Sequence, residues 1–185
     1  MQALLALSRA IDFVNGHIGK AISWLILAAV IVSAGNATVR YAFDTSSNAW
    51  LELQWYLFSA VFLLGAGYTL LNNEHVRIDI IASHLSHRTR AWIDIIGGLL
   101  FLLPMALIIM WLGWPMFRES YLHHEVSNDA GGLLRWPVKL LVPVGFFLLS
   151  LQGVSEIIKR AAYLMGLAPD PLQAEGEHHG EHAAD

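Results

Sequence analysis

Cysteine is absent from this 185-residue chain, and charged residues are scarce. Without cysteine the chain can form no disulfide, no thiolate metal site and no thiol nucleophile. Asp, Glu, Lys and Arg make up 14% of the sequence against 56% hydrophobic residues, whereas soluble domains carry charge at about a quarter of positions. Too few charges remain to cover a surface exposed to water, which indicates a membrane protein.

The charges are also clustered, and four stretches contain no Asp, Glu, Lys, Arg or His: 21–39, 53–73, 95–117 and 140–155. The first three are each close to the roughly 20 residues that a helix needs to cross the hydrocarbon core, and the apolar residues 163–165 extend the fourth. The sequence therefore predicts an all-α integral membrane protein. Its membrane domain covers residues 1–168, with transmembrane helices at about 20–40, 52–73, 93–117 and 138–162.

Three segments outside these spans have their own patterns. Residues 2–18 place Leu4, Leu7, Ile11, Val14 and Ile18 at steps of three and four. This pattern predicts an amphipathic helix that either lies flat on the inner leaflet or extends the first span. A similar stripe in the loop before the third span predicts a short interfacial helix at 76–87, with a polar connector as the alternative. Residues 169–185 are rich in Pro, Gly, Glu, His and Ala and should form a disordered tail.

The distribution of basic residues predicts the orientation. Arg9, Lys20, Arg77, Arg88, Arg90, Lys159 and Arg160 fall on one side of the predicted spans, and Arg40, Arg118, Arg135 and Lys139 fall on the other. The side with more Lys and Arg faces the cytoplasm. We therefore expect both termini to be cytoplasmic, with the loops at 40–52 and 118–139 on the outer side. Because a long segment precedes the first apolar stretch, we expect an uncleaved signal-anchor rather than a signal peptide.

The residues that could support chemistry lie outside the spans. An ionisable side chain inside a span usually marks a substrate or proton path, and none of the four stretches contains one. Haem held between helices would need histidines within the spans, and all nine histidines lie at the edges, in the loops or in the tail. The tail histidines 178, 179 and 182 could bind a metal, but a solvated chain end explains them better. We therefore expect no catalytic residue, cofactor or metal, and no basic stripe suited to nucleic acid.

Two groups of charged residues remain. Arg40 and Glu52 flank the first outer loop, where they could pair with each other or with the loop of a partner. The cluster Glu74, His75, Arg77 and Asp79 follows the second span and could clamp the chain as it turns or bind lipid headgroups. The structural clamp is the preferred interpretation.

The second span and its exit resemble a known family. The segments are 52–58 (ELQWYLF) and 64–79 (LGAGYTLLNNEHVRID), supported by 36–41 (NATVRY), 92–94 (WID), 131–139 (GGLLRWPVK) and 143–146 (PVGF). In their order and spacing these segments are similar to the DctQ-type small membrane subunit of tripartite ATP-independent periplasmic (TRAP) transporters. The resemblance covers about residues 10–160, which is nearly the whole chain apart from the tail.

This resemblance implies a small permease subunit in a bacterial inner membrane that works in sodium-coupled secondary active transport. Its implied partners are a large permease subunit (M), which carries the substrate path and the sodium sites, and a periplasmic binding protein (P), which delivers an organic anion, commonly a carboxylate. The small subunit would brace the scaffold of the large one. Family motif positions expected to be structural or to contact partners are Arg40, Glu52, Asn73, His75, Arg77 and Asp79.

Two other functions stay open on the sequence alone. The chain could be a cytochrome b-like membrane anchor of a respiratory enzyme, or a small carrier that transports solute by itself. The first would require haem ligands, and the second would require a solute site within these four helices.

Overall fold

The computed structural model describes residues 2–45, 47–72 and 85–169. Helix α1 covers Gln2–Phe43, α2 covers Asn48–Leu71, α4 covers His87–Gly97, α5 covers Leu103–Leu122 and α6 covers Trp136–Leu164, and a π-helical turn, η1, covers Gly98–Leu102. The described residues form no strand, only one isolated antiparallel bridge between Val126 and Leu134. Within these described ranges, four helical stretches are long and apolar enough to cross a membrane, counting His87–Leu122 as one. The predicted all-α membrane fold is confirmed.

Helix α1, helix α6 and the stretch His87–Leu122 extend beyond the predicted spans at both ends, whereas α2 begins before its predicted span, at Asn48, and ends at Leu71. Helix α1 runs without interruption from Gln2, so the amphipathic segment at 2–18 extends the first helix and does not form a separate one. The predicted interfacial helix at 76–87 lies largely outside the described residues, and its last residue, His87, begins α4. The predicted tail likewise lies outside the described residues from 170 onward.

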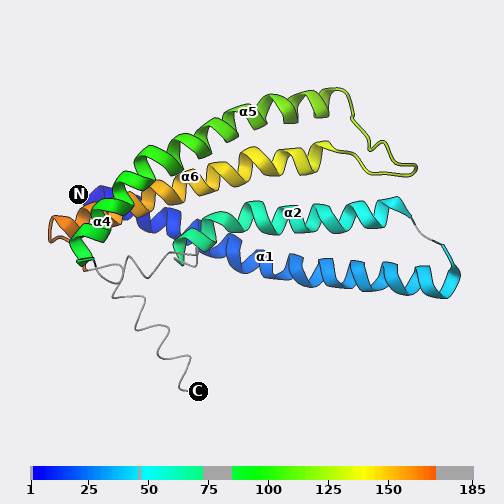
Figure 1. The fold of residues 1–185 in the computed structure, drawn as a ribbon, viewed down its shortest axis with the longest axis horizontal. Helices are drawn as coiled ribbons and strands as arrows, with labels where there is room; N and C mark the ends of the chain where they lie inside the picture. Colours follow the sequence, from blue (N-terminus) through cyan, green and yellow to red (C-terminus); the bar gives the residue numbers. More distant parts are fainter. Residues whose placement is uncertain (1, 46, 73–84, 170–185) are drawn as a thin grey trace, which may run out of the picture.

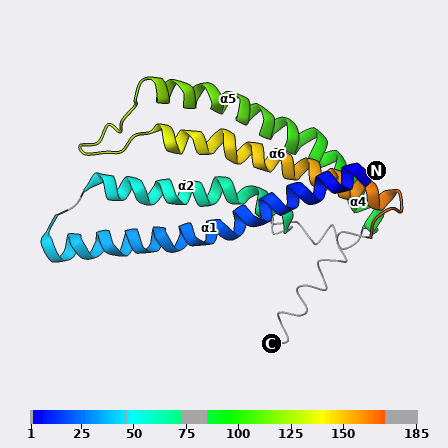
Figure 2. The same ribbon diagram turned by 180° about the vertical axis from the view of Figure 1, so that it is seen from behind.

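The helices lie side by side in the order α5, α6, α2 and α1 (Figure 1). The view from behind shows that the N-terminal half of α1 then crosses the C-terminal half of α6 (Figure 2). Helix α6 is therefore the one that contacts α1, α2, α4 and α5. In its most apolar window 50% of residues are buried, against 17%, 11% and 6% in the other three. The centre of the molecule is α6, and most of the apolar surface of the other helices faces outward.

Glycines allow α2 to lie close to its two neighbours. A Cβ atom at Gly145 of α6 would lie 2.6 Å from the backbone oxygen of Leu63 in α2, and one at Gly19 of α1 would overlap the ring of Tyr68 in α2. Backbones can approach this closely only where a side chain is missing, and such approaches hold helices together in lipid by van der Waals contact. Gly67 of α2 packs against Asn15, while Gly65 has open space beside it.

The third transmembrane stretch changes its hydrogen bonding one turn before a proline. Pro104 occupies the first turn of α5, directly after the π-helical turn Gly98–Leu102. A proline has no amide proton and its ring displaces the carbonyl of the preceding turn. A π-helical turn accommodates both effects without ending the helix. The helical stretch His87–Leu122 therefore continues past Pro104.

Candidate functional site

A cluster of polar side chains joins α1 to α6 where the two helices cross. Its members are Ser8, Asp12 and Asn15 of α1 and Gln152 and Ser155 of α6, here called the α1–α6 polar cluster. Ser155 Oγ donates to Asp12 Oδ1 at 2.7 Å and lies 2.7 Å from Ser8 Oγ. Gln152 Nε2 donates to Asp12 Oδ1 at 2.8 Å, and Gln152 Oε1 accepts from Asn15 Nδ2 at 2.9 Å. Each residue except Asp12 is buried, so the hydrogen bonds replace the water that these groups lack.

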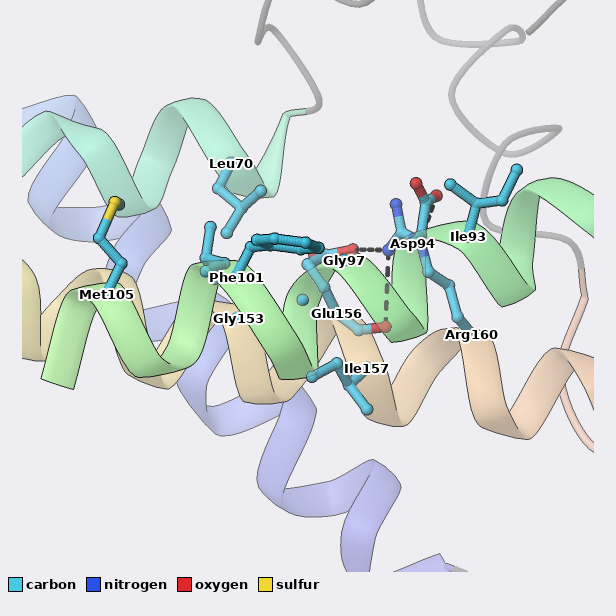
Figure 3. A pocket seen from close by; sticks show the side chains of 12 residues that line it. Leu70, Ile93, Asp94, Gly97, Phe101, Met105, Gly153, Glu156, Ile157 and Arg160 are labelled. Atoms are coloured by element: carbon cyan, nitrogen blue, oxygen red, sulfur yellow. Dashed lines mark hydrogen bonds and ion pairs between the residues drawn. The ribbon is translucent and has the colours of Figure 1, made fainter.

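Charged residues continue this cluster toward α4. Arg160 of α6 donates from Nε to Asp94 Oδ2 of α4 at 2.7 Å and from Nη1 to Glu156 Oε2. Lys159 Nζ lies 2.5 Å from Glu156 Oε1 and 3.3 Å from Asp12 Oδ2. Figure 3 shows Arg160 between the carboxylates of Asp94 and Glu156. We call Asp94, Glu156, Lys159 and Arg160 the charged lock.

The arrangement indicates a structural role for these charges. The side chains of Glu156 and Arg160 are 8% and 5% exposed, and unpaired charges at such burial would be costly. Each carboxylate of the lock has a cationic partner, and Asp12 adds hydrogen bonds from Gln152 and Ser155. The residues thus tie α1, α4 and α6 together at one end of the molecule. A network in which each charge has a partner favours a single arrangement of the helices. Such a network suits a structural role and not the binding and release of ions.

A second polar contact closes the opposite end of the molecule. Glu52, in the first turns of α2, is 4% exposed and accepts a hydrogen bond from the amide of Leu133 at 2.6 Å. Tyr56, one turn further along α2, donates to the carbonyl of Leu134 at 2.8 Å. We call this pair of contacts the outer clamp, since it fastens the loop at 123–135 to α2.

The same loop is also fastened to α6. Lys139 of α6 forms an ion pair with Glu125, and this ammonium group holds the pKa of the Glu125 carboxyl below its ordinary value. Arg135 donates to Ser127 Oγ at 3.2 Å, and its amide donates to the carbonyl of Glu125 at 2.8 Å. The loop is thereby held in one place over α2 and α6.

A groove of about 460 Å³ lies beside the charged lock. Its walls come from α2, α4, η1, α5 and α6, and most of its lining is apolar (Figure 3). Asp94, Glu156 and Arg160 stand at one end of it. No group of three or more His, Asp or Glu residues among the described parts of the chain is placed to hold a metal ion.

Comparison with known proteins gives the family. Residues 23–162 match the family described as "Tripartite ATP-independent periplasmic transporters, DctQ component". The chain belongs to the DctQ family. This match covers all four helices except the first part of α1 and the end of α6. No curated protein and no solved structure matches the chain.

Membership confirms the resemblance found in the sequence. A DctQ protein is one component of a tripartite transporter, so it works with partner subunits. Together with four helices long enough to span a bilayer, membership makes the chain a multi-pass membrane protein and a transporter component.

The structure of this DctQ chain separates two of the residues that the sequence placed together. Glu52 is buried in the outer clamp, whereas Arg40 is exposed in the last turn of α1. Among the described residues the two form no ion pair, because the Glu52 carboxylate accepts the Leu133 amide instead. The other four predicted positions, Asn73, His75, Arg77 and Asp79, lie outside the described residues. Contact of any of the six with a partner stays a prediction.

Sequence reasoning missed the α1–α6 polar cluster and the charged lock in this DctQ protein. Asp12 lies outside the apolar stripe that predicted a helix at 2–18, and Lys159 and Arg160 were used only to predict the orientation. One signal was available: Gln152, Ser155, Glu156 and Lys159 recur at steps of three and four, which places them on one face of a helix. A polar face on a membrane helix must meet another polar face, and Ser8, Asp12 and Asn15 provide one.

Proposed function

We propose that this chain is the small subunit of a sodium-coupled TRAP transporter that imports an organic anion, commonly a carboxylate. It braces the scaffold of the large permease subunit (M), and a periplasmic binding protein (P) delivers the solute. The protein resides in the bacterial inner membrane with both termini in the cytoplasm. DctQ membership supports the class of transporter, and the bias of Lys and Arg supports the orientation.

One observation carries the bracing role. Asp12 and the four residues of the charged lock pair with one another where α1, α4 and α6 meet. Between the lock and the outer clamp, residues 21–39, 53–71, 95–117 and 140–155 hold no Asp, Glu, Lys, Arg or His. A transport site for an anion and sodium needs charged or carbonyl ligands near mid-depth, so solute chemistry belongs to another subunit.

The shape of the chain supports the same role. The transmembrane-length helices lie side by side as a plate (Figures 1 and 2), which the charged lock and the outer clamp fasten at its two ends. Large side chains such as Phe62, Phe101 and Trp111 are 77%, 73% and 74% exposed, which suits contact with lipid or with helices of a larger partner. A plate of this kind can hold one part of a transporter still while another part moves.

Reconstitution tests this function. Proteoliposomes that contain the chain, the large permease and the binding protein should take up a carboxylate when an inward sodium gradient is applied. Gln152→Ala should lower the uptake rate while the amounts of the other two proteins stay equal. Ser150→Ala is the matched control, because Ser150 Oγ bonds only to the carbonyl of Phe146 in its own helix. Equal uptake for Gln152→Ala and wild type, with the helix contacts verifiably loosened, would contradict the bracing role.

A further inference from the structure

The groove beside the charged lock runs along the helices, not across them. Its lining on the third transmembrane stretch begins at Ile93 in α4 and ends at Met105 in α5. At about 1.5 Å per residue this stretch is roughly 18 Å long. One leaflet of a hydrocarbon core of about 30 Å is about 15 Å deep. The groove therefore has the length of a single leaflet.

Three glycines shape the groove. Gly97, Gly98 and Gly153 form part of its lining, with Leu102 and Ile157 beside them. A Cβ atom at Gly98 would lie 3.2 Å from Ile157, and one at Gly153 would overlap the end of Leu102, so these two glycines set how closely η1 and α6 approach. Gly97 differs, because a Cβ atom there would meet nothing within 4 Å. It faces open space in the groove.

The rim consists of apolar side chains that face outward. Ile93, Phe101 and Met105 are 52%, 73% and 51% exposed, and Leu70 of α2 stands opposite them (Figure 3). Where no partner helix covers it, such a rim on a membrane protein opens to lipid and not to water. Empty apolar space costs the van der Waals contacts of the atoms that line it, and in lipid the molecules available to fill it are acyl chains.

The charged end distinguishes this groove from ordinary lipid-facing surface. The apolar part of the groove ends near α4, at Asp94, Glu156 and Arg160. Helix ends with charged residues lie at the headgroup region of a membrane. A chain lying in the groove thus has its headgroup end at α4 and its tail toward Met105. We propose that the groove holds one acyl chain of a phospholipid from the leaflet at the α4 end, as a retained structural lipid. The proposal rests on the membrane location and is independent of the transported solute.

Filling the groove from Gly97 tests the proposal. Gly97→Leu adds a side chain whose Cβ atom meets nothing within 4 Å, and leucine favours helix over glycine by up to about 1 kcal/mol. Gly65→Leu is the matched control, since Gly65 is also a helical glycine with nothing within 4 Å of an added Cβ atom, and it does not line the groove. The full-length chain is purified in mild detergent from membranes, and phospholipids that remain bound are counted by native mass spectrometry.

We expect wild type and Gly65→Leu to retain one phospholipid and Gly97→Leu to retain about tenfold less. Equal retention by Gly97→Leu and wild type, or no retained phospholipid on the wild type, would overturn the proposal. Should Gly97→Leu not fold, Gly97→Met fills the same space with a flexible side chain. As a second readout, a phospholipid with a photoreactive group in its acyl chain should label Phe101 and Met105 in wild type. This labelling should fall in the Gly97 variants and stay in Gly65→Leu; labelling that does not depend on residue 97 counts against the groove.

Discussion

Gln152 of α6 bonds with both of its amide atoms to residues one turn apart on α1: Nε2 donates to Asp12 at 2.8 Å, and Oε1 accepts from Asn15 at 2.9 Å. The two helices are joined by residues that lie about 140 positions apart in the sequence. Gln152 is fully buried, so neither bond can be replaced by one to water. The arrangement fixes where α1 crosses α6.

Gln152→Ala should destabilise the chain through loss of this contact. It leaves the Asn15 amide without its acceptor and removes one donor from Asp12, and buried hydrogen bonds between membrane helices contribute about 0.6 to 1.7 kcal/mol. Thermal unfolding in detergent, followed by circular dichroism, measures the loss. Ser150→Ala should leave the transition near that of wild type, because its hydroxyl bonds within its own helix. Equal shifts for the two variants would show that the α1–α6 polar cluster does not hold the helices.

Gly145→Ala tests the close approach of α2 and α6. Its Cβ atom would lie 2.6 Å from the backbone oxygen of Leu63, so the helices must separate and lose contacts along their length. We expect a loss of about 1 to 3 kcal/mol, measured as the midpoint of unfolding in detergent. Gly65→Ala meets open space and should be neutral or slightly stabilising. A neutral Gly145→Ala would contradict the packing described for these helices.

Arg160→Leu should destabilise the chain more than a triple variant that also replaces Asp94 and Glu156. The single change leaves the carboxylates of Asp94 and Glu156 without this cation, and breaking a buried pair on one side costs about 3 to 5 kcal/mol. In the triple variant Asp94→Leu, Glu156→Leu, Arg160→Leu no carboxylate of the lock is left behind, and Lys159 keeps Asp12 as its partner. We therefore expect the triple variant to unfold at a higher temperature than Arg160→Leu. The reverse order would mean that these charges are not coupled as the structure places them.

Glu52 and Arg40 should respond differently, although the resemblance to the DctQ family singled out both. Glu52→Ala removes the acceptor for the Leu133 amide, so hydrogen exchange at 127–134 should accelerate. Arg40→Ala should leave exchange and thermal stability near wild type, because Arg40 is exposed and exposed single charges contribute little. If Arg40 contacts a partner, its loss should lower the yield of the complex with the large permease. Unchanged exchange in Glu52→Ala would argue against the outer clamp.

The spans could be predicted from the sequence because charge-free stretches of about 20 residues have few structures available to them besides membrane helices. The sequence did not predict which face of the N-terminal segment at 2–18 packs against the rest of the chain. The pattern of Leu4, Leu7 and Val14 indicates a helix, and in water these residues would be buried. In the structure they are 46%, 49% and 46% exposed, while Ser8 and Asn15 are buried. Lipid is itself apolar, so the polar residues are the ones that must find partners.

The site was harder to predict for a related reason. The partners of Asp12 lie on the last helix, and nothing in the spacing of a single sequence connects segments so far apart. Arg160 likewise reaches α4 through Asp94, a residue noted only as part of the motif at the start of the third span. Local sequence patterns identify a polar face on one helix, but only the fold shows which other helix packs against that face.

In the proposed assembly this chain carries no transport site of its own. A measurement of solute uptake by the chain alone is the sharpest test of that proposal. The purified chain is reconstituted in liposomes without the large permease, and a labelled carboxylate is added with the binding protein under an inward sodium gradient. We expect uptake no greater than in empty liposomes, and we expect uptake to be restored when the large permease is added. Sodium-dependent accumulation by the chain alone would contradict it.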